Sequence, residues 1–460
     1  MRRWLLVGVL ALLVAGASTV ALAGGHSPHG RSRRAGRCSV TVTPAQGAGA
    51  LASAIAQASG GATVCLAGGH YGTVAVHEAK PGGWVTVRPR PGAVAVVAGM
   101  ELADSSFLRF EGLHMSEGFN VVGSGEHLQW LGNVFEDPAY ALTLYGEQSP
   151  IRAVLFAHNY VHNATLGTLS SEAGEACSSG YSRGEDVVVK YAEGVKIADN
   201  TFDEADEHYI QGASAGAAGM TVTHNLFEGY YKYGCAHLNV WQIFAGGTND
   251  TFSDNVVVGK GVKYGVGPFA TGSEEASGDG LEFENGPGSA ECSAGPMRNT
   301  VIENNLWVDG ASAQPMQIFT TQGLVIRDNT VVRAGYGTWV LEGNEEAQDG
   351  QPRCGPSTGV VLEGNIDVDS QQSTSNEDFL VDGAGPGMRC AHNVSSDRSA
   401  ATIRGCEGRS RPHWRPRWRE VRWDPFALTA RGERFPRPPR GYYVARGLPF
   451  AAGYQGGGGP

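Results

Sequence analysis

A ten-residue phrase built around an asparagine recurs nine times in this chain and constrains its fold more than any other feature. The phrase is clear in "MTVTHNLFEG" (220–229), and successive copies place their asparagines 24 to 50 residues apart. The aligned positions are Asn133, Asn159, Asn200, Asn225, Asn255, Asn305, Asn329, Asn365 and Asn393. A base period of about 25 residues indicates a solenoid whose repeats contact their neighbours. The gap of 50 suggests one further coil that lacks the asparagine.

Each phrase predicts two short strands joined by a tight turn. The pattern V-x-I-x-x-N-x-F places alternate side chains on one face of a strand, and we expect the asparagine to adopt the left-handed conformation of the turn. A third alternating, β-branched stretch follows, as in "DVVVKYAEG" and "VWQIFAGG". A leucine-rich repeat shares the local signature, but its return segment would be helical or rich in leucine. Three strands per turn instead predict an all-β parallel β-helix of about ten or more coils.

The composition and the N-terminus agree with an exported, turn-rich protein. Glycine makes up 67 of the 460 residues, and only 18% are charged. Residues 1–23 combine two arginines, an apolar run and a final "ALA", which predicts a signal peptide. A membrane anchor is the alternative, but the apolar run is shorter than the roughly 20 residues of a span. Residues 24–37 read as a flexible linker, so we expect a secreted, extracellular monomer with no membrane association after cleavage.

The ends of the predicted β-helix, residues 38–403, require caps because they expose unpaired strand edges. "GALASAIAQASGG" (49–61) predicts a capping helix with Leu51, Ile55 and Ala58 on one stripe. Residues 404–460 form an Arg/Trp/Pro-rich segment, of which 404–446 hold 12 arginines and 4 acidic residues. A nucleic-acid patch is one interpretation. For an exported chain we favour an irregular C-terminal cap and tail, and we expect no nucleic-acid partner.

Eight cysteines in an exported chain predict disulfide bonds, because the extracellular environment is oxidising. We expect Cys38 to pair with Cys65 and Cys390 with Cys406, since each pair brackets one end of the repeat array. The sequence leaves the pairing of the other four open. It contains no C-x-x-C spacing, which argues against a zinc site.

Three segments give the chain a family resemblance: "LASAIAQASGGATVCLAGGHYG", the N-x-[apolar] rungs, and "CAHLNVWQIFAGGTNDTFSDN" (235–255). With them the chain resembles the secreted right-handed parallel β-helix family, the fold of pectate lyases and other polysaccharide-acting proteins. The third segment looks like the H-x-D-x-x-Q strand of uncharacterised bacterial members, here His237, Asn239 and Gln242. Asn239 replaces the aspartate, which argues against a general base there. The paired aspartates of polygalacturonases and the R-x-P-x-x-R of pectate lyases do not occur in this sequence.

The resemblance implies that substrate lies across the first strand of several coils, beneath the loops that enter it. By alignment these loops are 164–184, 204–207, 229–236 and 259–280, and long loops on one face of a rigid scaffold indicate a site. The strands beneath them present the candidate catalytic residues Asp186, Lys190, His208, His237, Glu282 and Glu284. The candidate substrate-binding residues are Tyr230, Tyr231, Lys232, Tyr233, Asn239 and Gln242. The tyrosines would stack against sugar rings.

Two chemistries fit these residue types. A lyase needs a base beside a uronate carboxylate and a positive charge on the developing enolate. Lys190, Lys232 or a histidine would be the base, and Ca²⁺ would supply the charge, held by Glu282, Glu284, Asp203 and Glu204. A hydrolase needs two carboxyl groups that flank the glycosidic oxygen, for which Asp186, Glu282 and Glu284 are the candidates. That mechanism requires no cofactor.

The sequence therefore predicts a protein that acts on an extracellular polysaccharide, as a lyase or a glycoside hydrolase. The net charge of −11 favours neutral glycans, or polyanions bridged by calcium. The alternative is a non-catalytic carbohydrate-binding, adhesion or cell-wall spacer protein. An enzyme predicts that His208, His237 and either Lys190 or Glu282 converge in one cleft, whereas a spacer would scatter them.

Overall fold

The structure is a computed structural model that describes residues 37–136, 138, 140–146, 149–164, 185–205, 208–213, 217–230, 239–243, 247–258, 280–283, 296–308, 316–318, 320–332, 339–341, 357–368, 387–391 and 393–395. The chain divides into two units, Met1–Arg37 and Cys38–Pro460, and the described helices and strands all belong to the second. Among them, no helix is long and apolar enough to cross a membrane.

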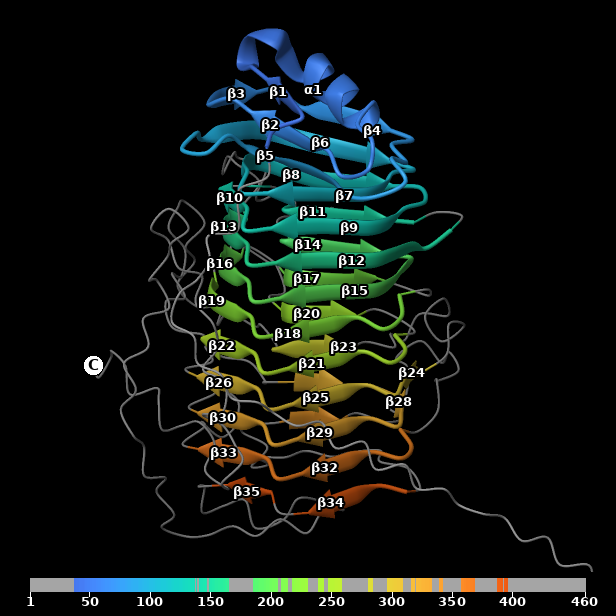
Figure 1. Cartoon of the computed structure of the whole chain (residues 1–460). Coiled ribbons are helices and arrows are strands. Elements are labelled where there is room, and N and C mark those ends of the chain that lie inside the picture. Colours follow the sequence, from blue (N-terminus) through green and yellow to red (C-terminus); the bar gives the residue numbers. More distant parts are fainter. Residues whose placement is uncertain are drawn as a thin grey trace, which may run out of the picture. The chain divides into compact units, whose positions relative to one another are not determined.

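Parallel strands stack in three columns, and the chain visits the columns in turn (Figure 1). The first column is a 13-stranded parallel sheet. Its strands are β1 (Val40–Val42), β2 (Thr63–Leu66), β5 (Val85–Pro89), β7 (Ser106–Glu111), β9 (Glu126–Leu131), β12 (Ile151–Ala157), β15 (Ala192–Ala198), β18 (Thr221–Thr223), β21 (Thr251–Ser253), β25 (Val301–Glu303), β29 (Val325–Arg327), β32 (Val361–Glu363) and β34 (Arg389–Ala391).

The second column begins where the chain leaves the first sheet. It contains β3 (Gly69–Tyr71), β10 (Val134–Glu136), β13 (Tyr160–Ala164), β16 (Thr201–Ala205), β19 (Leu226–Tyr230), β22 (Val256–Val258), β26 (Leu306–Val308), β30 (Thr330–Val332), β33 (Ile366–Val368) and β35 (Val394–Ser395). The long strands β6 (Ala95–Ala103) and β8 (His114–Val122) run through both the second and the third columns.

The third column returns the chain to the first sheet. It contains β4 (Val74–His77), β11 (Leu142–Tyr145), β14 (Val187–Lys190), β17 (His208–Ala213), β20 (Asn239–Ile243), β23 (Leu281–Phe283), β27 (Met316–Ile318) and β31 (Trp339–Leu341). A short pair, β24 (Met297–Arg298) and β28 (Thr321–Gln322), precedes two strands of the first sheet. The predicted fold class, a right-handed parallel β-helix with three strands per coil, is confirmed.

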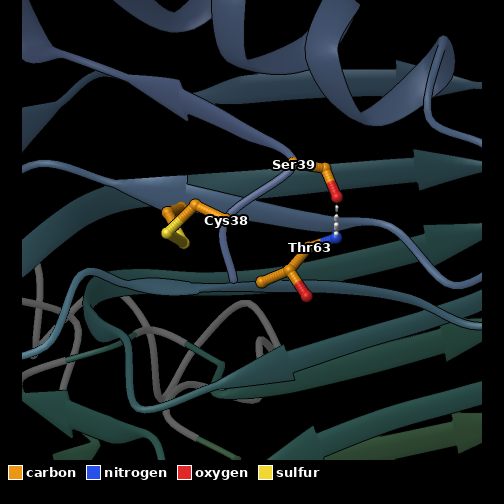
Figure 2. Close-up of a disulfide and its surroundings, with 4 residues drawn as sticks. Cys38, Ser39 and Thr63 are labelled. Carbon is orange, nitrogen blue, oxygen red and sulfur yellow. Dashed lines mark hydrogen bonds between the residues drawn. A yellow bond between two sulfur atoms is a disulfide. The ribbon is translucent and has the colours of Figure 1, made fainter. Parts of the chain in front are cut away.

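The N-terminal end carries a short helix, as predicted. Helix α1 (Gly47–Ala56) follows the 3₁₀ turn η1 (Pro44–Gln46) and buries Leu51 and Ile55 completely, while Ala58 packs against the same core beyond the helix end. Cys38 and Cys65 form the predicted disulfide, with their Cα atoms 5.5 Å apart (Figure 2). Beside it, the Thr63 amide donates a hydrogen bond to the Ser39 hydroxyl at 3.0 Å. Cys390 is also disulfide-bonded, but Cys406 lies outside the described residues, so that pairing stays a prediction.

The nine repeat asparagines form one continuous ladder inside the turn between the first and second columns. Each side chain is at most 1% exposed. In the link from Asn200 to Asn225, the Asn225 Oδ1 accepts bonds from the Asn200 backbone amide at 3.0 Å and from its Nδ2 at 2.9 Å. Asn225 Nδ2 in turn bonds the Asn255 Oδ1 and the Ile197 carbonyl. The ladder thus satisfies buried amides and strand-end carbonyls together.

Two expectations about the repeat are wrong. The left-handed residue of the turn is the one before the asparagine, as at Asp199 (φ 57°) and His224 (φ 56°), because the asparagine itself must point inward to bond its neighbours. The 50-residue gap hides no coil, since Asn255 bonds directly to Asn305 and β21 pairs directly with β25. The extra residues are insertions within one coil.

Inside the coils, like side chains stack into aromatic columns. Phe202 and Phe227 lie 5.0 Å apart and almost parallel, at 4°, and Phe227 continues onto Phe252 at 6.1 Å. The rings come from the residue two after the ladder asparagine and from the first column. Their complete burial explains why the first seven copies of the repeat carry an apolar residue two after the asparagine.

We predict that Asn225→Ala lowers the free energy of unfolding by about 3 kcal/mol or more, because it leaves several buried partners of the amide unsatisfied. Chemical denaturation measures the loss. The matched control is Asn120→Ala on β8, an exposed asparagine whose replacement should cost less than about 0.5 kcal/mol. Equal losses in the two variants would contradict a stabilising role for the ladder.

A second prediction concerns Asp250, which is 1% exposed and accepts a hydrogen bond from the Met220 amide at 2.8 Å. Burial raises its pKa to about 7 from 3.8, although the bond to Met220 opposes the shift. The folded state therefore binds more protons than the unfolded state between about pH 4 and pH 7, and stability falls as the pH rises through that window. Asp250→Asn removes this loss.

The stability advantage of Asp250→Asn should accordingly be about 2 kcal/mol larger at pH 8 than at pH 5. Thermal melting of both proteins at the two pH values measures it. A difference that is constant with pH would show that Asp250 is ionised in the folded protein.

Candidate functional site

The third column sets the neighbours of several predicted residues. His208 lies opposite Asn239, and Gln211, Gln242 and Glu282 follow one another in register on β17, β20 and β23. His208, Asn239 and Gln242 are buried, with at most 4% exposure. The register therefore places the predicted residues in two rows of backbone positions. His208 and Asn239 lie in one row, and Gln242 and Glu282 lie in the other, three residues further along the strands.

Lys190 does not join this group. It lies opposite Ala213, five positions along the strand from the level of His208, which is about 16 Å. Its ammonium group sits 5.6 Å from the ring centre of Tyr145. Parallel register therefore sets the backbones of Lys190 and His208 at opposite ends of paired strands. The expected convergence of His208, His237 and either Lys190 or Glu282 stays a prediction, because His237 and the Glu282 side chain lie outside the described residues.

A second set of polar side chains faces outward from the second column. Glu136, His162 and Asp203 occupy successive rungs on β10, β13 and β16. The carboxylate Oδ2 of Asp203 accepts a hydrogen bond from the Tyr160 hydroxyl at 2.8 Å and lies 3.1 Å from His162 Nδ1. The Tyr160 and His162 rings stack at 5.7 Å. With 36% of the His162 side chain and 15% of that of Asp203 exposed, this group has access to solvent.

The contact with Asp203 fixes the chemistry of His162. When the carboxylate accepts the Nδ1 proton, Nε2 is left as the basic nitrogen. In that tautomer the carboxylate orients the ring, and Nε2 can accept a proton. This is the arrangement of a general base and its orienting group.

Asp186 lies just before β14 and is 1% exposed. Burial raises the pKa of its carboxyl well above 3.8, and repulsion from Asp203 and then from Glu185 raises it further. Within the described part of the chain its Oδ1 has no hydrogen-bond partner. The backbone amide of Asp186 bonds the His208 carbonyl at 3.0 Å, which brings the start of β17 to this carboxyl. Burial and the neighbouring carboxylates therefore favour the protonated form of the Asp186 carboxyl.

Of the predicted catalytic residues, Asp186 and His208 meet at this junction between the second and third columns. Tyr160, His162 and Glu185 were missed by the sequence analysis, and Asp203 was assigned to metal binding. The signal for two of them was available, because His162 and Asp203 each follow a ladder asparagine by three residues. His237, Glu284, Tyr231, Lys232 and Tyr233 lie outside the described residues, and only the backbones of Tyr230, Glu204 and Glu282 are described.

The predicted calcium ligands do not form one group in the described structure. Asp203 belongs to the second column and Glu282 to the third, two coils further on. No cluster of three or more histidine, cysteine, aspartate or glutamate side chains with metal-binding geometry occurs among the described residues. Because Glu284 and the side chains of Glu204 and Glu282 are not described, the calcium site stays a prediction.

Comparisons with known proteins add context at the level of the fold. No protein-family model and no curated protein matches the chain. Among solved structures, a mutant of the PL6-family alginate lyase AlyGC is 13% identical with a TM-score of 0.46, covering 90% of this chain and 56% of that one. The Streptococcus pneumoniae surface protein and adhesin PfbA is 10% identical with a TM-score of 0.45, covering 75% and 94%. The pectate lyase Pel9A is 11% identical with a TM-score of 0.40, covering 78% and 80%.

The predicted resemblance holds for the fold. The strand pairing described above establishes it without help from these comparisons. At such identities and TM-scores the solved structures assign no activity, and the chain spans little more than half the length of the AlyGC protein.

We predict that Asp203→Asn lowers the pKa of Asp186, because it removes the largest charge that opposes ionisation of that carboxyl. The pKa should remain above the ordinary value of 3.8, since burial is the larger cause. Infrared difference spectroscopy of the protonated carboxyl, with isotope-labelled aspartate, follows the titration. The control is Glu136→Gln, one rung before His162, which should leave the Asp186 titration unchanged.

Proposed function

We propose that this protein is a secreted glycoside hydrolase that cleaves a neutral extracellular polysaccharide at the junction of the second and third columns. One observation carries the proposal. The carboxyl of Asp186 is buried and its pKa is raised well above its ordinary value, in part by repulsion from the Asp203 carboxylate, which Tyr160 and His162 hold. General acid–base cleavage of a glycosidic bond requires a proton donor and a proton acceptor in contrasting environments, here Asp186 and the His162–Asp203 pair.

The roles follow from the environments. Asp186, whose raised pKa favours the protonated form, donates its proton to the glycosidic oxygen as the leaving group departs. The His162–Asp203 pair accepts the proton of the attacking water through Nε2 of His162. The proposal requires that the glycosidic oxygen reaches Asp186, whose burial keeps bulk water from its proton beforehand.

Local charge supports hydrolysis of a neutral glycan over elimination from a uronate. Glu136, Glu185 and Asp203 give the junction an acidic character. Lys190, a candidate base for the lyase reaction in the sequence analysis, lies at the far end of β14 over the Tyr145 ring. A uronate chain would approach this surface against electrostatic repulsion.

The test is incubation of the purified protein with soluble neutral glycans and with alginate and pectate. New reducing ends without unsaturated products are expected from the neutral glycans. Asp186→Asn and His162→Ala should each lower the rate by about 100-fold or more. Asp199→Asn, on the turn that precedes the ladder residue Asn200, is the control and should retain full activity. Absorbance from unsaturated sugars would assign the site to a lyase, and unchanged rates in Asp186→Asn would remove the proposed acid.

The non-catalytic alternative makes a different prediction. A binding protein would hold the same glycans without releasing any product. Binding by calorimetry together with intact substrate after prolonged incubation would favour it over the hydrolase.

A further inference from the structure

A row of aromatic residues occupies the start of successive strands in the first sheet, away from the acidic junction. Pairing of β5 with β7 and of β7 with β9 places Trp84, Phe107 and His127 on consecutive rungs. All three side chains are only half-buried. The Phe107 and His127 rings lie 4.6 Å apart at 32°, and the Trp84 ring stands nearly perpendicular to both. We call these three residues the aromatic shelf.

The backbone at this position of the coil is left-handed, which disfavours large side chains. Phe107 has φ 58° and His127 has φ 55°. The next coil places the small Ala153 (φ 53°) at the equivalent rung, and later coils place glycine or asparagine there, where a positive φ costs least: Gly194, Gly219, Asn249, Asn299, Gly323 and Gly359. Bulky residues in this conformation are outliers, and such strain persists where it serves a function.

Burial in the core does not explain the strain, because the rings are partly exposed. Their contacts with one another, and the Arg109 guanidinium 4.8 Å from the Trp84 ring centre, hold the shelf in place. The shelf therefore presents fixed aromatic surface at the outside of the coil.

A cavity of about 400 Å³ adjoins the shelf through Phe107. This volume falls within the range of small-ligand sites. Three hydroxyl groups from different coils line it, those of Ser106, Ser124 and Ser149, and Lys80, Glu126 and Arg152 stand around them. Arg152 is already paired with Glu193 at 2.8 Å, so the charges around the cavity are balanced. Aromatic surface, hydroxyl groups and balanced charge match the chemistry of a neutral sugar.

We propose that the aromatic shelf and this cavity bind a neutral hexopyranose unit of a glycan. The ring stacks on the shelf and its hydroxyl groups bond the serines. The choice of a neutral glycan as the ligand rests on the proposed function. The site itself does not, since none of its residues belongs to the acidic junction. This site anchors a polymer on the same β-helix that carries the proposed cleavage site.

The experiment measures binding of cellohexaose, mannohexaose and a guluronate hexamer by isothermal titration calorimetry. The protein carries Asp186→Asn so that no cleavage intervenes. At least one neutral hexasaccharide should bind. Phe107→Gly should weaken that binding at least tenfold, while its melting temperature stays close to that of the starting protein, because relief of the strained backbone offsets the lost ring contacts.

Two further variants keep the test decisive. Ala153 follows His127 on the next coil and also has a positive φ of 53°. Ala153→Gly changes the backbone there without removing an aromatic ring, and this variant should bind as the starting protein does. Trp84→Leu should weaken binding with the backbone at the Phe107 rung unchanged. The proposal is overturned if neither neutral sugar binds, if only the guluronate binds, or if Phe107→Gly binds normally. Binding that survives a failed hydrolysis assay would leave this site standing and remove only the proposed cleavage.

Discussion

The hydrogen bonds of the buried asparagine ladder are the constraint on which the rest of the structure depends. Each amide is enclosed, so its donors and acceptors must be satisfied by the coils on either side. A coil that slipped by one residue would turn its asparagine outward and leave its neighbours unpaired. Insertions of any length are tolerated between rungs, because the ladder bonds adjacent coils whether 24 or 50 residues separate the asparagines. The register of each coil is therefore set by its contacts with the neighbouring coils and does not depend on the length of the loops between them.

This constraint explains how much the sequence could predict. Counting from each ladder asparagine gives the second column directly, and position +3 yields Glu136, His162 and Asp203 as one outward row. We assigned Asp203 to a metal site because "DEADE" looked like a contiguous acidic loop. In the structure its first residues belong to β16, where alternation turns Asp203 toward His162. Alignment on the asparagines would have found this pair.

The third column was less predictable for a physical reason. Segments of unequal length separate it from the ladder, so its register cannot be counted from the asparagine. Asp186 follows Asn159 by 27 residues, whereas His208 follows Asn200 by 8. The expected neighbour of His208 was His237, but its rung partner is Asn239. The raised pKa of Asp186 was equally out of reach, because it arises from burial and from a carboxylate on another column.

The two sites use the same rigid coil in different ways. The coil of β12, β13 and β14 supplies Arg152 to the cavity at one corner, and His162 and Asp186 to the acidic junction at another. Because the ladder and the strand pairing hold this coil in one register, the spacing between the two corners is fixed. Under the two proposals, a polymer anchored at the aromatic shelf would be held at a high effective concentration near Asp186 and Asp203, without any movement of the scaffold. The backbone at Phe107 and His127 is strained because these coils carry aromatic rings at a left-handed position. The later coils carry smaller residues at the same position.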